Sequence, residues 1–221
     1  MFIGHFALAF GAKKFAPNAS LGILFLACQF ADLLWPNLVL LGVEQLEIDP
    51  GNTLMTPLNF LHYPFSHSLV SLLLWAALLA GSYALLAKTG ARVATVVGLL
   101  VVSHWVLDVI THRPDMPIAL GESARIGFGL WNAPLIAVAL ELALMAAGVW
   151  LYLAQTTAKD RIGTIGLWSL VIFLLIVYTA NLLGPPPPSA TAVAWSAQAM
   201  WLIVAWGYWV DSHRISESSY T

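Results

Sequence analysis

One stretch of the sequence begins as an apolar run and ends in side chains that commonly bind metal ions. Within it, His104, Asp108 and His112 are spaced at i, i+4 and i+8. Since each helical residue advances by about 100°, these side chains drift by only about 80° and share one helix face. Pro114 cannot continue a helix, so we expect the helix to end near Arg113. The spacing therefore predicts a row of imidazole, carboxylate and imidazole groups.

Further metal-ligand or acidic side chains lie in or beside other apolar runs: His5, Asp32, His62, His67 and Glu141. An ionisable group inside a membrane costs a few kcal/mol, so such groups usually face a cavity or pair with one another. Polar groups of this kind can also serve only to hold helices together through hydrogen bonds. Imidazole and carboxylate ligands without thiolates favour zinc, manganese or iron(II) in a hydrolytic site. A metal there would polarise a phosphoryl or acyl oxygen and activate water.

The composition identifies the environment in which these groups must lie. The 221 residues are 60% hydrophobic and only 9% charged, whereas a soluble domain has about 25% charged residues. We therefore expect an integral membrane protein with the lipid bilayer as its main partner. A net charge of -2 argues against nucleic acid as a partner. Cys28 is the only cysteine, so no disulfide can form within the chain.

The apolar runs predict the membrane spans, because about 20 helical residues cross a hydrocarbon core of about 30 Å. The runs that are long enough are Ser20–Val43, Leu69–Ala87, Val93–Thr111, Leu130–Leu153, Ile165–Leu183 and Ala192–Val210. Phe2–Gly11 is shorter, and is either a short or tilted span or a re-entrant segment. Pro36 should kink or end the first long helix. We predict an all-α polytopic membrane protein with six or seven transmembrane helices, forming a single domain over residues 1–221.

The connections between these runs differ in charge. The segment Glu44–Pro64 is rich in charges and turn formers and predicts an exposed loop. Alternate connections carry the basic residues Lys13, Lys14, Lys88, Arg92, Lys159, Arg161 and Arg214, whereas the opposite ones carry Arg113 and Arg125. The positive-inside rule places the first set in the cytoplasm. The histidine and aspartate side chains are then expected to gather toward the extracytoplasmic side.

Two segments, His62–Leu69 and Ser103–Thr111, resemble the membrane-bound metal-dependent hydrolases of bacteria, the LexA-regulated inner-membrane type often called YdjM-like. That family has an early Gly-His, an apolar segment ending in aspartate, an H-x-x-x-(T/S)-H-S loop and an S-H-x-x-x-D helix. In this sequence these elements fall on Gly4-His5, Asp32, His62 with His67 and Ser68, and Ser103 with His104 and Asp108. The resemblance covers about the first 115 residues.

The family is in turn distantly similar to zinc-dependent phospholipase C and the related single-strand nucleases, which bind zinc through histidine and aspartate. The resemblance implies phosphodiester hydrolysis, a divalent metal with zinc foremost, and a multi-pass location in the bacterial inner membrane. One departure from the pattern concerns the first aspartate. The usual P-D-(L/I)-D is replaced here by Ala31-Asp32-Leu33-Leu34, which lacks the second carboxylate.

Three hypotheses follow from these residues. The first is a metal-dependent hydrolase that acts on a phosphoester or a lipid headgroup bond, with a phospholipid or lipid-linked substrate. Its metal ligands would be His5, Asp32, His62, His67, His104, Asp108 and His112, and its catalytic carboxylates Asp32, Asp108 and Glu141. The second is a metal- or proton-coupled transporter that uses the same cluster, and the third is a non-catalytic membrane protein. A transport path needs polar groups through the whole membrane depth, whereas a hydrolytic site needs ligands that converge at one point.

Overall fold

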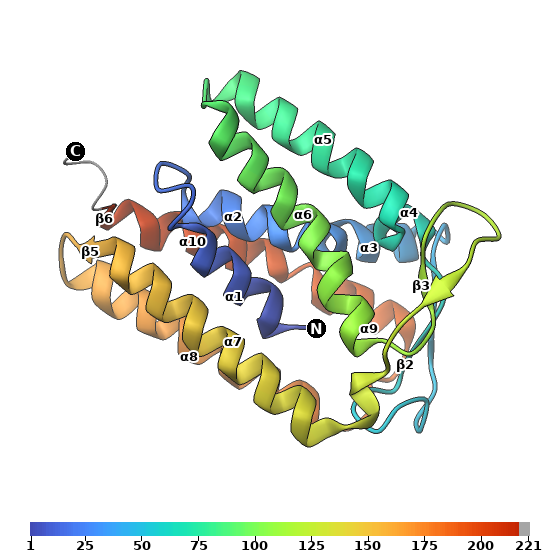
Figure 1. The fold of residues 1–221 in the computed structure, drawn as a ribbon. Helices are drawn as coiled ribbons and strands as arrows, with labels where there is room; N and C mark the ends of the chain where they lie inside the picture. Colours follow the sequence, from blue (N-terminus) through green and yellow to red (C-terminus); the bar gives the residue numbers. More distant parts are fainter. Residues whose placement is uncertain (217–221) are drawn as a thin grey trace.

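The computed structural model describes residues 1–216 and consists mostly of helices (Figure 1). Within these residues, four helices are long and apolar enough to cross a membrane: α5 (Leu69–Leu86), α6 (Ala91–Thr111), α7 (Pro134–Gln155) and α8 (Arg161–Leu183). A fifth crossing is present if the bent pair α2 (Leu21–Cys28) and α3 (Phe30–Leu40) is counted as one span. The chain is therefore a helical membrane protein. Its span count is four or five, against the six or seven predicted.

The lower count has three local causes. Helix α1 (Ile3–Ala12) has 10 residues and is only about 15 Å long, half of a bilayer core. The predicted last span is divided into α9 (Ala190–Ala197) and α10 (Met200–Ser212), neither of which is long enough. The first long run bends by 54° between α2 and α3. This bend lies at Gln29, while Pro36 is accommodated inside α3 without ending it.

A cap of loops and short strands covers one end of the helices. Strands β1 (Gln45–Ile48) and β2 (Leu58–His62) form an antiparallel hairpin in the segment predicted as an exposed loop. Two shorter strands, β3 (Met116–Pro117) and β4 (Arg125–Ile126), pair beyond the end of α6. The remaining short elements here are α4 (Pro64–His67) and the 3-10 turn η1 (Leu130–Asn132). A small second core under the hairpin consists of Trp35, Leu46, Phe60, Tyr63, Val109 and Met116.

The opposite end of the helices is closed by a different strand pair. Strand β5 (Thr156–Ala158) follows α7 and pairs with β6 (Arg214–Ser216) near the end of the chain. Lys13, just after α1, forms an ion pair with Asp211 at 2.7 Å. Figure 1 shows β5 and β6 at one end of the molecule, and β2 and β3 at the other. The basic residues of the first set in the charge analysis therefore collect at the end away from the hairpin.

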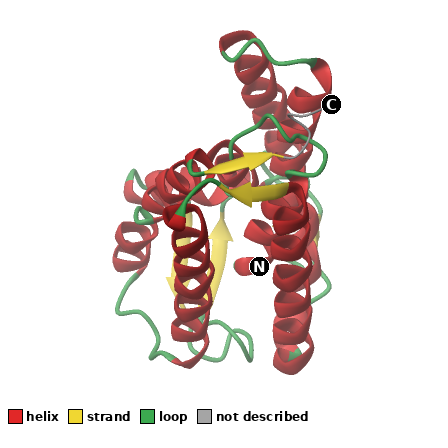
Figure 2. Cartoon of the chain, turned by 90° about the vertical axis from the view of Figure 1, so that its left-hand side faces the viewer, coloured by secondary structure: helices red, strands yellow, loops and turns green. Residues whose placement is uncertain are grey.

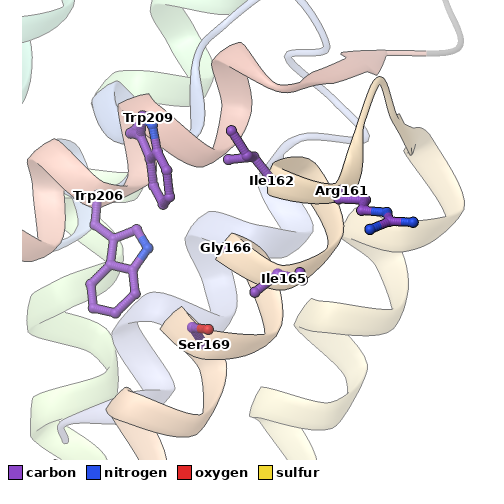
Figure 3. Close-up of a pocket in the computed structure, with 7 residues that line it drawn as sticks. All are labelled: Arg161, Ile162, Ile165, Gly166, Ser169, Trp206 and Trp209. Atoms are coloured by element: carbon purple, nitrogen blue, oxygen red, sulfur yellow. The ribbon is translucent and has the colours of Figure 1, made fainter.

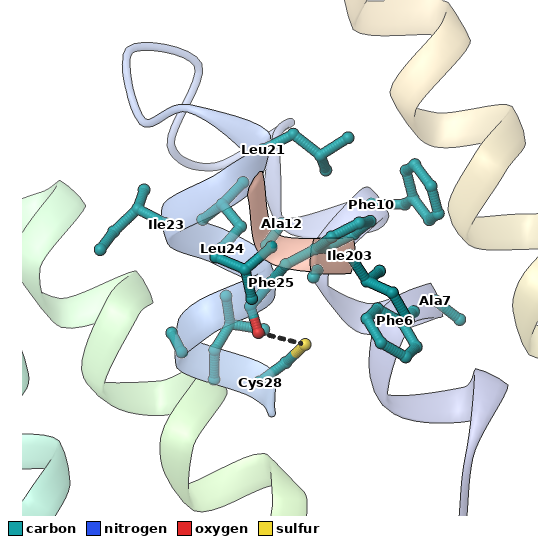
Figure 4. Close-up of a cluster of buried hydrophobic side chains, with 14 of the residues drawn as sticks. Phe6, Ala7, Phe10, Ala12, Leu21, Ile23, Leu24, Phe25, Cys28 and Ile203 are labelled. Carbon is teal, nitrogen blue, oxygen red and sulfur yellow. Dashed lines mark hydrogen bonds between the residues drawn. The ribbon is translucent and has the colours of Figure 1, made fainter. Parts of the chain in front are cut away.

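Helix α1 is buried inside the bundle, where it packs mainly against α7 and α2 (Figures 1 and 2). The main core is built where it meets α2, with Phe6 and Phe10 edge-on to Phe25 at centroid distances of 5.0 and 5.1 Å (Figure 4). Gly148 of α7 faces the backbone of Ala7, and only hydrogen fits between them. This close approach places the start of α1 beside α6, where His5 meets the side chains described next.

Candidate metal centre

Five of the seven predicted metal ligands converge near the hairpin end of the bundle. They form two groups that share His104: His5, His104 and Asp108, and Asp32, His67 and His104. Within each group, one ligand atom from every residue lies within 4.8 Å of the others. The residues come from α1, α3, α4 and α6, which are far apart in the sequence. The fold therefore assembles a compact set of metal-ligand side chains from four separate helices.

The geometry around His104 places two carboxylates on the same nitrogen. Its Nε2 atom lies 3.1 Å from Asp108 Oδ2 and 3.7 Å from Asp32 Oδ1. His67 faces the same oxygens, with its Nε2 3.3 Å from Asp32 Oδ1 and 4.0 Å from Asp108 Oδ2. His5 lies on the other side of Asp108, with Nε2 3.1 Å from Oδ1. Asp108 thus directs its two oxygens to different histidines.

Two further contacts complete the surroundings of Asp108 and His5. The Met1 amino group lies 2.5 Å from Asp108 Oδ1 and 3.2 Å from Thr111 Oγ1. The rings of His5 and His104 stack in parallel, with centroids 3.8 Å apart and an angle of 4° between the planes. Oδ1 of Asp108 is therefore in contact with the start of the chain and with α1, while Oδ2 faces Asp32 and the other two histidines.

The bend between α2 and α3 determines how His104 is oriented. Because α2 ends at Cys28, the carbonyl of this residue has no helical N–H partner. It accepts a hydrogen bond from Nδ1 of His104 at 2.8 Å. A carbonyl can only accept, so Nδ1 carries the proton, and in a neutral ring Nε2 then carries an unshared lone pair.

This lone pair supplies the test of whether a metal fits. Nε2 of His104 is buried and makes no hydrogen bond to any residue within 1–216, although carboxylate oxygens lie nearby. A lone pair facing carboxylate oxygens is repulsive unless a metal ion lies among them or a proton occupies Nε2. Imidazole nitrogens and carboxylate oxygens at such separations are the donor set of zinc and related divalent ions. The residues present therefore fit a divalent metal.

The cluster is closed on most sides. The side chains of His5, His67, His104 and Asp108 are each at most 4% exposed. Asp32 differs, because its side chain is 24% exposed. Water or a small polar group can therefore meet the cluster at Asp32, which makes this carboxylate its contact with the exterior.

His62 and His112 lie apart from the cluster. Helix α6 ends at Thr111, two residues earlier than expected, and His112 has an extended backbone. It therefore leaves the helix face of His104, and its Nδ1 bonds instead to Asp115 at 3.0 Å. The expected row of three side chains along one helix is not formed. His62, on β2, is half-buried beside the ring of Phe65.

Glu141 of α7 has a different environment from the one expected for a catalytic base. It is 1% exposed, and its Oε2 accepts the backbone N–H groups of Phe2 and Gly4 at 2.9 and 3.1 Å. These N–H groups at the start of α1 have no helical partner of their own. Glu141 therefore holds the beginning of α1, and through it the position of His5.

Sequence reasoning missed Glu44 and Ser66. Glu44 was assigned to an exposed loop, yet it is 1% exposed and bonds to Ser66, which in turn contacts His67. Glu44 and Ser66 are 22 positions apart, and neither helical nor strand periodicity predicts a contact at that separation. The serines of Ser66-His67-Ser68 belong to the motif described above, but sequence reasoning gave the Ser66 hydroxyl no role beside His67.

A cavity of about 220 Å³ lies at the opposite end of the molecule between α8 and α10 (Figure 3), and its lining is Arg161, Ile162, Ile165, Gly166, Ser169, Trp206 and Trp209. It is mostly apolar and shares no residue with the cluster.

In comparisons with known proteins, no family model matches this chain, and neither a curated protein nor a solved structure is detectably similar. The resemblance in the short motifs therefore stays an expectation from sequence.

Proposed function

We propose that this membrane protein is a metal-dependent hydrolase that cleaves a phosphoester or related lipid headgroup bond at the extracytoplasmic face. The observation that supports it most strongly is the meeting of His67 and His104 with Asp32 and Asp108. The hydrogen bond from Nδ1 to the Cys28 carbonyl leaves His104 with a buried Nε2 that has no hydrogen-bond partner among the described residues and faces two carboxylates. Such a set of pre-oriented ligands is the arrangement that metalloenzymes use.

In this proposal His67, His104, Asp32 and Asp108 hold the metal, with His5 as a further ligand. A divalent metal supplies Lewis acidity toward a phosphoryl or acyl oxygen. The chain supplies the orientation, because the Nδ1 bond of His104 fixes which nitrogen is available. It also supplies a general base: Asp32 is the least buried carboxylate of the cluster, at 24% exposed, and can take a proton from water that enters beside it.

The depth of the cluster supports a lipid headgroup as the substrate. Asp108 lies three residues before the end of α6 and His104 seven residues before it, or about 4.5 and 10 Å along the helix axis. The hydrocarbon core is about 30 Å thick, so with α6 ending at its edge Asp108 lies close to the headgroup level and His104 about 10 Å inside the core. Asp32 contacts His67 just before α5 begins, and so lies near the headgroup level too. A transport path would instead need polar groups at several depths.

The distribution of basic residues supports the extracytoplasmic side. Lys13, Lys159 and Arg214 gather at the end of the molecule closed by β5 and β6. The positive-inside rule assigns that end to the cytoplasm. The cluster lies at the other end of α6 and therefore faces outward. A location in the bacterial inner membrane follows from the resemblance alone and is part of the proposal.

The experiment is headgroup release by zinc-loaded protein in mixed micelles of phosphatidylglycerol and, separately, phosphatidylcholine. We expect release of a water-soluble phosphate product by wild type and a loss of at least 100-fold with Asp32→Asn. His213→Ala is the matched control, since His213 lies in the tail near β6 and contacts Asp160. Zinc binding without release, combined with zinc uptake into proteoliposomes, would replace the hydrolase proposal with the transporter.

A further inference from the structure

The chain contains a buried carboxylate that no part of the proposed reaction uses. Glu44, which precedes β1, accepts three hydrogen bonds: at Oε1 from the backbone N–H groups of Phe65 and Ser66, at 2.8 and 2.9 Å, and at Oε2 from the Ser66 hydroxyl at 2.6 Å. Among residues 1–216, no basic nitrogen lies within 4.0 Å of it. A carboxylate that satisfies its oxygens with neutral donors is held firmly and can only accept.

The hydroxyl of Ser66 connects this carboxylate to the candidate metal centre. Its Oγ lies 2.6 Å from Glu44 Oε2 and 2.7 Å from Nδ1 of His67. A serine has one hydroxyl proton. Ser66 donates this proton to Glu44 Oε2, so His67 must provide the proton for the second bond. Nδ1 of His67 is therefore protonated, and its lone pair is at Nε2, toward Asp32.

We infer that Glu44, acting through Ser66, is the positioning group that presents the Nε2 lone pair of His67 to the metal. This inference rests on the proposed metal function. The Cys28 carbonyl does the same for His104. Second partners of this kind fix the ring orientation and the protonated nitrogen, and their loss typically weakens metal binding by about 10- to 100-fold.

A different interpretation of the same contacts is a Ser–His–Asp triad with Ser66 as nucleophile. The burial of Ser66 argues against it, because this residue is 0% exposed and its hydroxyl is directed to Glu44. An attacking oxygen must meet its substrate. Ser66 is therefore a link within the protein rather than a reacting group.

The first test is the protonated nitrogen of His67 in the metal-free protein. In Glu44→Gln the amide oxygen can still accept from the N–H groups of Phe65 and Ser66, but its NH2 group then faces the Ser66 hydroxyl and can only donate. The hydroxyl proton turns to His67 Nδ1, and the ring proton moves to Nε2. Long-range proton–nitrogen correlation spectra of full-length protein labelled at histidine, with His67→Ala for assignment, measure this. We expect Nδ1–H in wild type and Nε2–H in Glu44→Gln, and the same nitrogen in both would overturn the inference.

The second test is zinc affinity, measured by competition against a chelator, with the visible spectrum of the cobalt-loaded protein. Glu44→Gln and Ser66→Ala should each weaken zinc binding about 10- to 100-fold and alter the cobalt bands. Glu47→Gln is the matched control, since Glu47 lies on the same hairpin and, among residues 1–216, its side chain hydrogen-bonds to Asn59 and to no residue of the cluster. If Glu44→Gln does not fold, the zinc affinity of Ser66→Ala tests the inference by itself, because this variant keeps the hydrogen bonds from the backbone N–H groups to Glu44.

The outcomes separate this inference from the proposed function. A wild-type protein that binds zinc, together with Glu44→Gln and Ser66→Ala variants that bind it equally well, refutes the positioning role and leaves the metal centre intact. A wild-type protein that binds no zinc removes the proposed function and, with it, this role for Glu44. In that case the protonated nitrogen of His67 still reports whether the hydrogen-bond chain exists.

Discussion

The close approach of α1 to α7 gives the sharpest stability prediction. A methyl group on Gly148 would lie 2.2 Å from the carbonyl oxygen of Ala7 and 2.9 Å from its Cα. These are backbone atoms, so no side-chain rotation can relieve the contact. Helix α1 would have to retreat by about 1 Å to restore van der Waals separation. His5 lies two residues from Ala7 on the same helix and would move with it.

The magnitude follows from two opposing effects in Gly148→Ala. Alanine gains up to about 1 kcal/mol over glycine in a helix interior, and overpacking a close contact typically costs about 1–3 kcal/mol. The backbone contact favours the upper part of that range, so we expect a net loss of about 1–2 kcal/mol. For a chain of this size this corresponds to a fall of roughly 2–8 °C in Tm. Zinc affinity should fall about tenfold as well, because ligand distances tolerate about 0.2 Å.

Gly81→Ala is the control for this prediction. Gly81 is inside α5, and an added methyl there meets no neighbouring atom within 4 Å among the described residues. Only the helix gain applies, so its Tm should equal or exceed that of wild type. Thermal unfolding in detergent, followed by tryptophan fluorescence, measures both variants. If Gly148→Ala is as stable as Gly81→Ala and binds zinc like wild type, the packing argument for α1 is wrong.

Three further predictions concern other parts of the chain. Cys28 is fully buried, so a maleimide reagent should leave it unlabelled in the folded protein and label it after denaturation; rapid labelling of the native state would contradict its placement. Lys13→Ala should destabilise the protein by about 3 kcal/mol in thermal unfolding, because it removes the partner of Asp211, which is 12% exposed; an unchanged Tm would show that the pair contributes little. Hydrogen bonds from His213 and from the backbone of α8 lower the pKa of Asp160 in the folded protein. The contact therefore stabilises the fold fully above the pKa of Asp160 in the unfolded chain, about 4. This stabilisation is lost as the pH falls through the lower pKa of the folded protein. A carbon-detected NMR titration should give a pKa for Asp160 below that of Asp160 in the unfolded chain, and an equal or higher value would contradict this.

The long spans were predictable because hydropathy is a local property. Helices α5 and α6 end close to the bounds expected from the sequence: α5 ends at Leu86, just before Lys88 with its positive φ, and α6 ends shortly before Pro114. The bend at Gln29 and the division of the last run at Gln198 each lie at a single glutamine inside an otherwise apolar segment, and a glutamine by itself does not end a helix. Packing against other helices decides such breaks, and an apolar run carries no signal for it.

The candidate site was predictable as a set of residue types and unpredictable as a geometry. His104 and Asp108 are one turn apart, so a single helix places them together. The contact of Asp32 with His67 depends on how α3 and α4 pack, and the segment from Glu44 was expected to be exposed. His112 was expected on the helix face, but α6 ends before it and its partner is Asp115. Long-range pairing of polar groups has no period that a single sequence reveals.

The metal content of the purified protein tests the central claim most directly. Elemental mass spectrometry after incubation with zinc and removal of the free ion would compare wild type, His104→Ala, Asp32→Asn and His213→Ala, each checked for folding by circular dichroism. We predict at least one equivalent of zinc in wild type and in His213→Ala, and a loss of that metal in the other two. Absence of metal from wild type, or its full retention in His104→Ala and Asp32→Asn, would contradict the metal centre.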